Sequence, residues 1–92
     1  QERFKKGPHN MKKVITREVA QYWRCSEAAC NNGAQFWTDG NKIYSYQLPI
    51  GYTTPQGEKV ALDYTSGGSK GFQSMTTSKH VGYVKARATI IE

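Results

Sequence analysis

Residues 34–52, AQFWTDGNKIYSYQLPIGY, contain two runs of alternating apolar and polar residues on either side of an Asp-Gly-Asn turn. Asp-Gly between two such runs is a strong signal for an antiparallel β-hairpin. In the second run, strict alternation predicts one strand with a tyrosine-rich face made of Tyr44, Tyr46, Leu48, Ile50 and Tyr52. Pro49 lacks an amide hydrogen for the strand ladder, so we expect this strand to lie near a sheet edge or to be bulged there.

The next residues extend the hairpin into a meander. Residues 54–57, TPQG, have proline second and glycine fourth, which suits a type I turn. Residues 59–65, KVALDYT, alternate again and place Val60, Leu62 and Tyr64 on one face. The sequence therefore predicts three antiparallel strands, with residues 72–75 as a brief fourth.

Helical patterns occur on both sides of this meander. Thr16 is a favourable N-cap residue, and apolar spacing predicts a first helix over residues 17–31. A second helix is predicted from about Ser78, with an apolar stripe that docks on the tyrosine-rich face. The stripe consists of Val81, Val84, Ala88 and Ile91. Helix, meander and helix together predict one small α+β domain over residues 11–92.

Composition limits the possible functions. Thirteen Lys and Arg residues against seven Asp and Glu residues give 92 residues a formal charge of +6. Residues 1–10 contribute +2 of this charge, and we expect them to be a tag or a flexible arm. A charge of this size suits either simple solubility or a polyanionic partner, and the sequence leaves both open. No apolar run approaches the roughly 18 residues of a membrane span, so we expect no membrane contact.

No catalytic or metal-binding signature is present. Cys25 and Cys30 miss the two-residue spacing of a zinc pair, and His9 and His80 are distant in sequence. Residues 66–71, SGGSKG, do not match the spacing of a phosphate-binding P-loop. We therefore expect no enzyme activity, no cofactor and no metal, with both thiols reduced.

The start of the second helix is the candidate binding site. Free backbone amides, hydroxyl groups and cationic side chains near one helix end form a plausible phosphate site. The predicted nucleic-acid-binding residues are Lys70, Thr77, Ser78, Lys79, His80, Tyr83 and Arg87. The alternative is that Thr76 or Thr77 only caps the helix. Trp37 and Tyr83 are the aromatic residues that we expect to remain available for base stacking.

The segments YSYQLPIG and TTSKHVGYV resemble small uncharacterised proteins encoded by phages and other mobile elements, over residues 36–84. This resemblance implies an accessory role in the cytoplasm of a host cell and brings no established activity. The element order is also similar to that of double-stranded RNA-binding domains, although their Lys-Lys-x-Ala-Lys run is absent.

We therefore expect a phage-type accessory protein that binds nucleic acid through a basic, sequence-independent surface. The alternative is a protein–protein module that inhibits or redirects a host enzyme or defence complex through an acidic partner. A third possibility is a homo-oligomer that forms through a sheet edge near Pro49.

Overall fold

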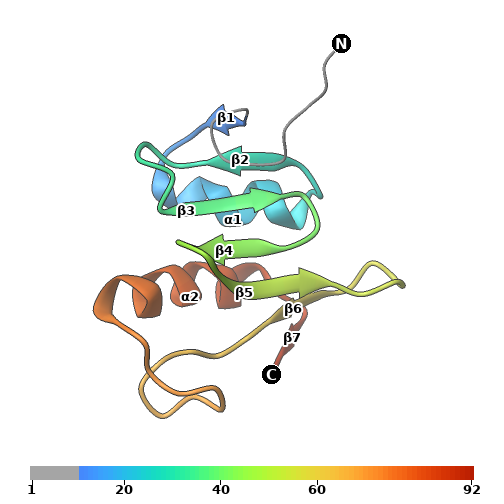
Figure 1. Ribbon diagram of the computed structural model, residues 1–92. Coiled ribbons are helices and arrows are strands. Elements are labelled where there is room, and N and C mark those ends of the chain that lie inside the picture. Colours follow the sequence, from blue (N-terminus) through green and yellow to red (C-terminus); the bar gives the residue numbers. More distant parts are fainter. Residues whose placement is uncertain (1–10) are drawn as a thin grey trace.

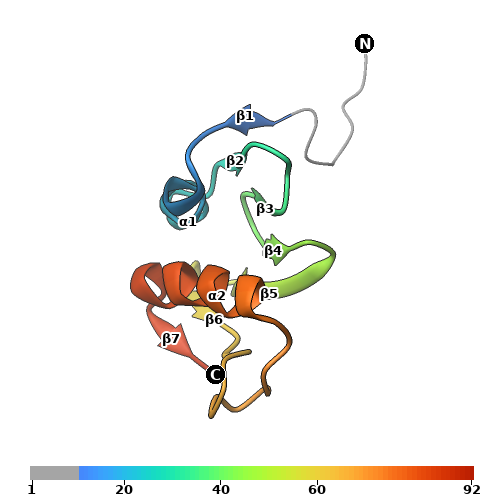
Figure 2. The same cartoon turned by 90° about the vertical axis from the view of Figure 1, so that its left-hand side faces the viewer.

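Two helices lie on the same face of a seven-stranded sheet in the computed structural model, which describes residues 11–92 (Figures 1 and 2). The elements in chain order are β1 (Lys12–Lys13), α1 (Thr16–Arg24), β2 (Ala28–Cys30), β3 (Phe36–Asp39), β4 (Ile43–Ser45), β5 (Leu48–Thr53), β6 (Lys59–Ala61), α2 (Met75–Arg87) and β7 (Ile90–Ile91). The predicted α+β class is confirmed. The predicted three or four strands are wrong, because residues 11–92 form seven.

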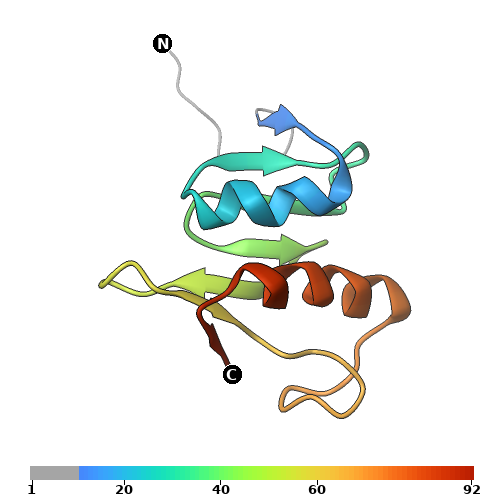
Figure 3. The ribbon, with the colours of Figure 1, turned by 180° about the vertical axis from the view of Figure 1, so that it is seen from behind.

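The strand order explains why both helices cover one face. Strands β2 to β6 form an antiparallel meander, whereas β1 pairs with β2 and β7 pairs with β6 in parallel. Strands β2 and β6 point the same way, and both parallel units step across the sheet in the same direction. Right-handed crossovers, the strong rule for such units, then place α1 and α2 on one face. The two helices consequently run side by side in the same direction (Figure 3).

The predicted hairpin is present between β3 and β4. The Asp39 carboxylate accepts hydrogen bonds from the backbone amides of Asn41 and Lys42, both at 2.9 Å. Gly40 has φ of +98°, and a Cβ atom there would lie 3.0 Å from the carbonyl oxygen of Ser26. The Asp-Gly-Asn sequence is therefore used both for its turn and for close contact with the end of α1.

The predicted long second strand is wrong, because the chain turns at Tyr46 and Gln47 and divides it into β4 and β5. Tyr46 adopts φ of +58°, a conformation unusual for a tyrosine. The turn exchanges the expected faces: Ile43 and Ser45 point to the helices and are buried, while Tyr44 points away.

The irregularity expected near Pro49 is present. Tyr44 pairs with Pro49 and Ile43 with Gly51, which leaves Ile50 as the extra residue of a bulge. However, β5 has β4 and β6 as neighbours, so Pro49 is not at a sheet edge. The edge strands within residues 11–92 are β1 and β7.

Both helices differ from their predicted bounds. Helix α1 ends at Arg24, because Ser26 takes φ of +60° and redirects the chain into β2. Helix α2 begins three residues earlier than predicted, at Met75, so the predicted fourth strand at residues 72–75 is absent. It ends at Arg87, and Ile91 lies exposed in β7 instead of on the helix stripe.

The core lies between the helices and the sheet. Its fully buried members are Val19, Ala20, Trp23, Phe36, Ile43, Ile50, Ala61, Val81 and Val84. Val81 and Val84 therefore belong to the docking stripe as predicted, and Ala88 packs against the same cluster. Ile43 and Phe36 belong to this cluster, whereas the expected Tyr44 and Tyr46 lie outside it.

Candidate nucleic-acid interface

The first turn of α2 is capped by Ser74. Its Oγ accepts a hydrogen bond from the amide of Thr77 at 3.0 Å, and its carbonyl oxygen accepts one from the amide of Ser78 at 2.9 Å. No acidic residue occupies this turn. Within the described chain, the amides of Met75 and Thr76 keep the partial positive charge of a helix N-terminus.

Ser74→Ala is expected to cost about 1 kcal/mol of unfolding free energy, because it removes the side-chain cap. Urea unfolding of this variant measures the loss. Ser69→Ala, a change at an exposed loop position, is the matched control and should leave stability within about 0.5 kcal/mol of the unchanged protein. Equal stability of the two variants would show that Ser74 does not cap α2.

Thr77 and His80, two of the predicted site residues, point into the protein. The Ser45 Oγ lies 3.0 Å from the Thr77 Oγ1 and 2.8 Å from the His80 Nδ1. The His80 ring stacks on Phe36 with centroids 4.4 Å apart and planes 6° apart. Thr77 and His80 are only 4% and 3% exposed, so neither reaches a ligand at the surface. They connect α2 to β4 instead.

Burial also fixes the charge state of this imidazole. Desolvation, with a smaller contribution from the nearby Lys79 ammonium, lowers the pKa of His80 to about 4. The ring is therefore neutral at pH 7 and adds nothing to a phosphate site.

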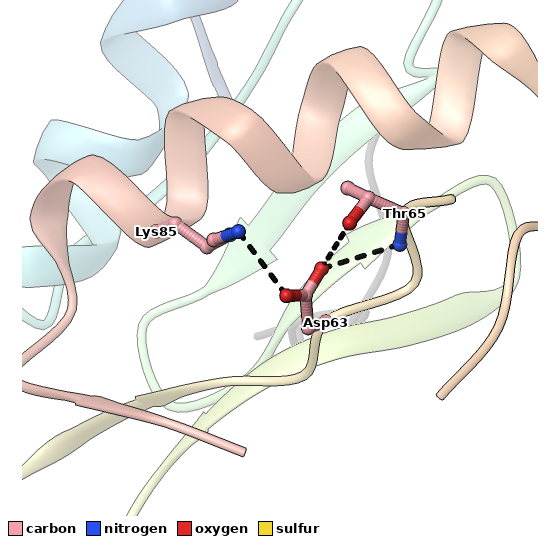
Figure 4. Close-up of polar contacts among 3 residues, drawn as sticks. All are labelled: Asp63, Thr65 and Lys85. Atoms are coloured by element: carbon pink, nitrogen blue, oxygen red, sulfur yellow. Dashed lines mark hydrogen bonds and ion pairs between the residues drawn. The ribbon is translucent and has the colours of Figure 1, made fainter. Parts of the chain in front are cut away.

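The loop that carries Lys70 is held against α2 by Asp63 (Figure 4). The Asp63 carboxylate accepts from the Lys85 Nζ at 3.1 Å and from the amide and hydroxyl of Thr65. The hydrogen bond from Thr65 is the largest cause that lowers the pKa of Asp63, and Lys85 adds to it. The backbone amide of Lys70 donates to the carbonyl oxygen of Asp63 at 3.0 Å. The Lys70 side chain is exposed.

Gly68 makes this loop conformation possible. A Cβ atom at Gly68 would lie 2.5 Å from backbone and carboxylate atoms of Asp63. The glycine-rich segment is thus more than a connector, because it closes around the carboxylate that neutralises Lys85.

The remaining cations of the two helices are exposed. The predicted Lys79 and Arg87 lie on α2, and Arg17 and Arg24 of α1, which sequence reasoning missed, lie on the neighbouring helix. We call these four residues the basic helix surface. Within residues 11–92 the one ion pair is Lys85–Asp63, so none of the four is neutralised by a carboxylate. Arg17 and Arg24 are seven residues apart in the sequence, a spacing that places two residues on the same face of a helix.

The ends of the two helices meet at this surface. The Arg24 Nη1 donates to the carbonyl oxygen of Arg87 at 3.1 Å. Seven residues separate the cations on α1 and eight separate those on α2, which corresponds to roughly 10 and 12 Å along the helices. Tyr83, another predicted nucleic-acid-binding residue on α2, is half-buried, and its ring centroid lies 6.1 Å from that of Phe36.

A shallow pocket of about 500 Å³ overlaps this surface and is lined by Arg17, Glu18, Gln21, Tyr22, Cys25, Glu27 and Arg87. Arg17 and Arg87 therefore share the pocket with two glutamates, so its formal charge is balanced. The unbalanced positive charge of the basic helix surface lies at Arg24 and Lys79, outside the pocket.

Other candidate chemistry has little support in the described residues. No cluster of three metal-ligating side chains occurs within residues 11–92, and no disulfide links Cys25 to Cys30. Lys59 is buried, and its Nζ donates to Ser26 Oγ at 3.0 Å and Thr53 Oγ1 at 2.7 Å. Burial lowers the pKa of Lys59.

Comparisons with known proteins give no relative for this chain. No family model matches it, and neither a curated protein nor a solved structure is significantly similar to it. The resemblance to phage proteins therefore stays a prediction. No helix in the described part of the chain is long and apolar enough to cross a membrane.

Proposed function

We propose that the protein binds nucleic acid through phosphate contacts made by the basic helix surface, without reading base sequence. The phage-type accessory role in a host cell forms part of this proposal. The observation that carries it is the distribution of cations. Within residues 11–92, Arg17, Arg24, Lys79 and Arg87 are exposed and make no ion pair, whereas Lys85 pairs with Asp63 and Lys59 is buried.

Phosphate binding suits this arrangement for physical reasons. Arginine and lysine side chains that neutralise phosphates release condensed counterions, and this release supplies sequence-independent affinity. The N-terminus of α2 adds partial positive charge, and the exposed Lys70 extends the surface along the loop. Contacts of this kind position a protein on nucleic acid and carry no sequence information.

The test uses a fluorescently labelled DNA duplex and alanine variants. Arg24→Ala and Lys79→Ala should each weaken binding for all sequences about equally and lower the dependence of log K on log salt by about one contact. Melting temperatures should change little, because both side chains are exposed. Fluorescence anisotropy at several salt concentrations measures affinity and slope together.

Lys42→Ala is the matched control, because it removes the same charge from the exposed β3–β4 turn, outside the basic helix surface. The affinity of this variant for duplex should equal that of the unchanged protein. If Lys42→Ala weakened binding as much as Lys79→Ala, the helices would not form the specific contact surface.

One observation favours the alternative of a protein partner with an acidic surface. Three large apolar side chains are exposed: Tyr46 in the turn between β4 and β5, Phe72 in the segment before α2, and Met75 at the first position of α2. Such residues suit a protein contact flanked by Lys70 and Lys79. This alternative would be favoured if the protein inhibited a host enzyme or defence complex but did not bind duplex DNA at low salt.

A further inference from the structure

The sheet face opposite the helices carries a stacked pair of aromatic rings. Trp37 of β3 and Tyr44 of β4 are cross-strand partners, with ring centroids 4.0 Å apart and planes 8° apart. Both side chains are partly exposed. No helix of the described chain covers this face, because α1 and α2 lie together on the other one (Figure 2).

This pair belongs to a row that crosses five strands. Strand pairing aligns Lys13, Cys30, Trp37, Tyr44 and Pro49 from β1 to β5. Lys13 is exposed at one end of the row and makes no ion pair within the described residues. Trp37, Tyr44 and Pro49 are partly exposed, whereas Cys30 is fully buried and does not reach a ligand. Two strand spacings, about 10 Å, separate it from the position of Trp37.

The rings are held in place before any ligand arrives. The Trp37 Nε1 donates to the carbonyl oxygen of Tyr46 at 2.8 Å, which fixes the indole across the β4–β5 turn. The unusual backbone conformation of Tyr46 places its carbonyl oxygen next to the indole, where it accepts this hydrogen bond. A fixed aromatic platform loses little side-chain entropy on binding.

We propose that this row binds single-stranded nucleic acid, with an unpaired base stacked on the Trp37–Tyr44 pair and a phosphate near Lys13. The proposal rests on the proposed function for its class of partner and adds a second surface and a strand preference. Base–aromatic stacking is tolerant of sequence, because every base has a π-face. Charge complementarity favours this occupant over an apolar peptide: the Lys13 ammonium is exposed at one end of the row, makes no ion pair within residues 11–92 and suits a phosphate.

The two surfaces face opposite directions, so substitutions at one should leave binding at the other unchanged. Duplex DNA, whose bases are already paired and stacked, engages the basic helix surface alone. A short single strand engages the aromatic row as well.

The test uses the fluorescence of the two tryptophans. Trp23 is fully buried in the core, so a base that stacks on the sheet should quench Trp37 alone. An unlabelled thymidine 12-mer should quench this component, whereas a DNA duplex should bind without quenching it. In the Trp37→Phe variant, the remaining Trp23 signal should not respond to either probe.

Affinity provides the second readout. Trp37→Ala and Tyr44→Leu should each weaken binding of the thymidine 12-mer by roughly fivefold or more and leave duplex affinity unchanged. Tyr52→Leu is the matched control, because Tyr52 lies on the same sheet face outside this row. Its affinity for the 12-mer should stay within about twofold of the unchanged protein. Thermal melts confirm that each variant is folded.

Several results would overturn the proposal, and they differ from failure of the proposed function. Binding of the 12-mer without quenching, or with full affinity in Trp37→Ala and Tyr44→Leu, rejects stacking while the phosphate contacts of the helices stand. Self-association that Trp37→Ala abolishes would show that a second copy of the chain covers this face. Absence of binding to either DNA at low salt would reject both proposals.

Discussion

Val84→Asp is expected to unfold the protein. The Val84 side chain is fully buried in the core cluster between α2 and the sheet. An aspartate there would be a buried carboxyl group without a partner, which costs several kcal/mol whether it ionises or takes up a proton. Small domains have only about 5–15 kcal/mol of total stability, and this one lies at the small end in size.

Circular dichroism and thermal melting measure this effect. Ala86→Asp is the matched control, because residue 86 lies exposed on the same helix only two positions away. We expect it to cost no more than about 1 kcal/mol, mainly through the unfavourable charge near the helix C-terminus. An unchanged melting temperature for Val84→Asp would mean that α2 buries a different face.

Acidification is expected to destabilise the protein through His80. The pKa of His80 is about 4 in the folded protein, below its ordinary value of 6.5, because burial disfavours the imidazolium. Between these values the unfolded chain binds the proton more readily than the folded chain, so stability is full above pH 6.5 and falls as pH decreases toward 4. The difference between these two pKa values corresponds to about 3 kcal/mol of unfolding free energy.

The groups around the imidazole support this direction. Ser45 and Thr77 are neutral hydroxyls, Phe36 and Tyr46 contact the ring, and Lys79 adds a positive charge that opposes protonation. Asp63, whose pKa is lowered, would add its own loss of stability mainly below pH 4.

His80→Phe separates this contribution from the others. Phenylalanine would keep the stack on Phe36, and the Ser45 and Thr77 hydroxyls, 3.0 Å apart, would still bond each other. Urea unfolding at pH 7, 5.5 and 4.5 should show a steep loss for the unchanged protein and a much smaller one for the variant. Parallel pH profiles for the two proteins would exclude His80 as the cause.

The sequence predicts the β3–β4 hairpin correctly because Asp39, Gly40 and Asn41 have local turn chemistry. The β4–β5 turn has no such signal, since Tyr46 and Gln47 lack the glycine or asparagine that a positive φ normally favours. When the alternation of apolar and polar residues is continued through this turn, it therefore predicts the wrong buried face for β4. The parallel pairing of β1 with β2 depends on contacts distant in sequence, and Ala28–Cys30 reads equally well as helix.

The errors in the candidate site have the same origin. Thr77 and His80 look like surface residues of a helix start until Ser45 is known to point toward α2, and that orientation depends on the turn at Tyr46. By contrast, the exposure of Lys79 and Arg87 follows from helical periodicity alone. Arg17 and Arg24 have the same periodicity on α1, so the sequence held the signal for the whole basic helix surface.

The most direct test of the central claim is the salt dependence of DNA binding by the unchanged protein. Anisotropy of a labelled duplex, titrated at about 50 and 200 mM salt, gives the slope of log K against log salt. Four phosphate contacts from the basic helix surface predict a slope of roughly −3 to −4, or about a hundredfold weaker binding at the higher salt. No measurable binding at 50 mM salt, or an affinity that salt leaves unchanged, would contradict the claim.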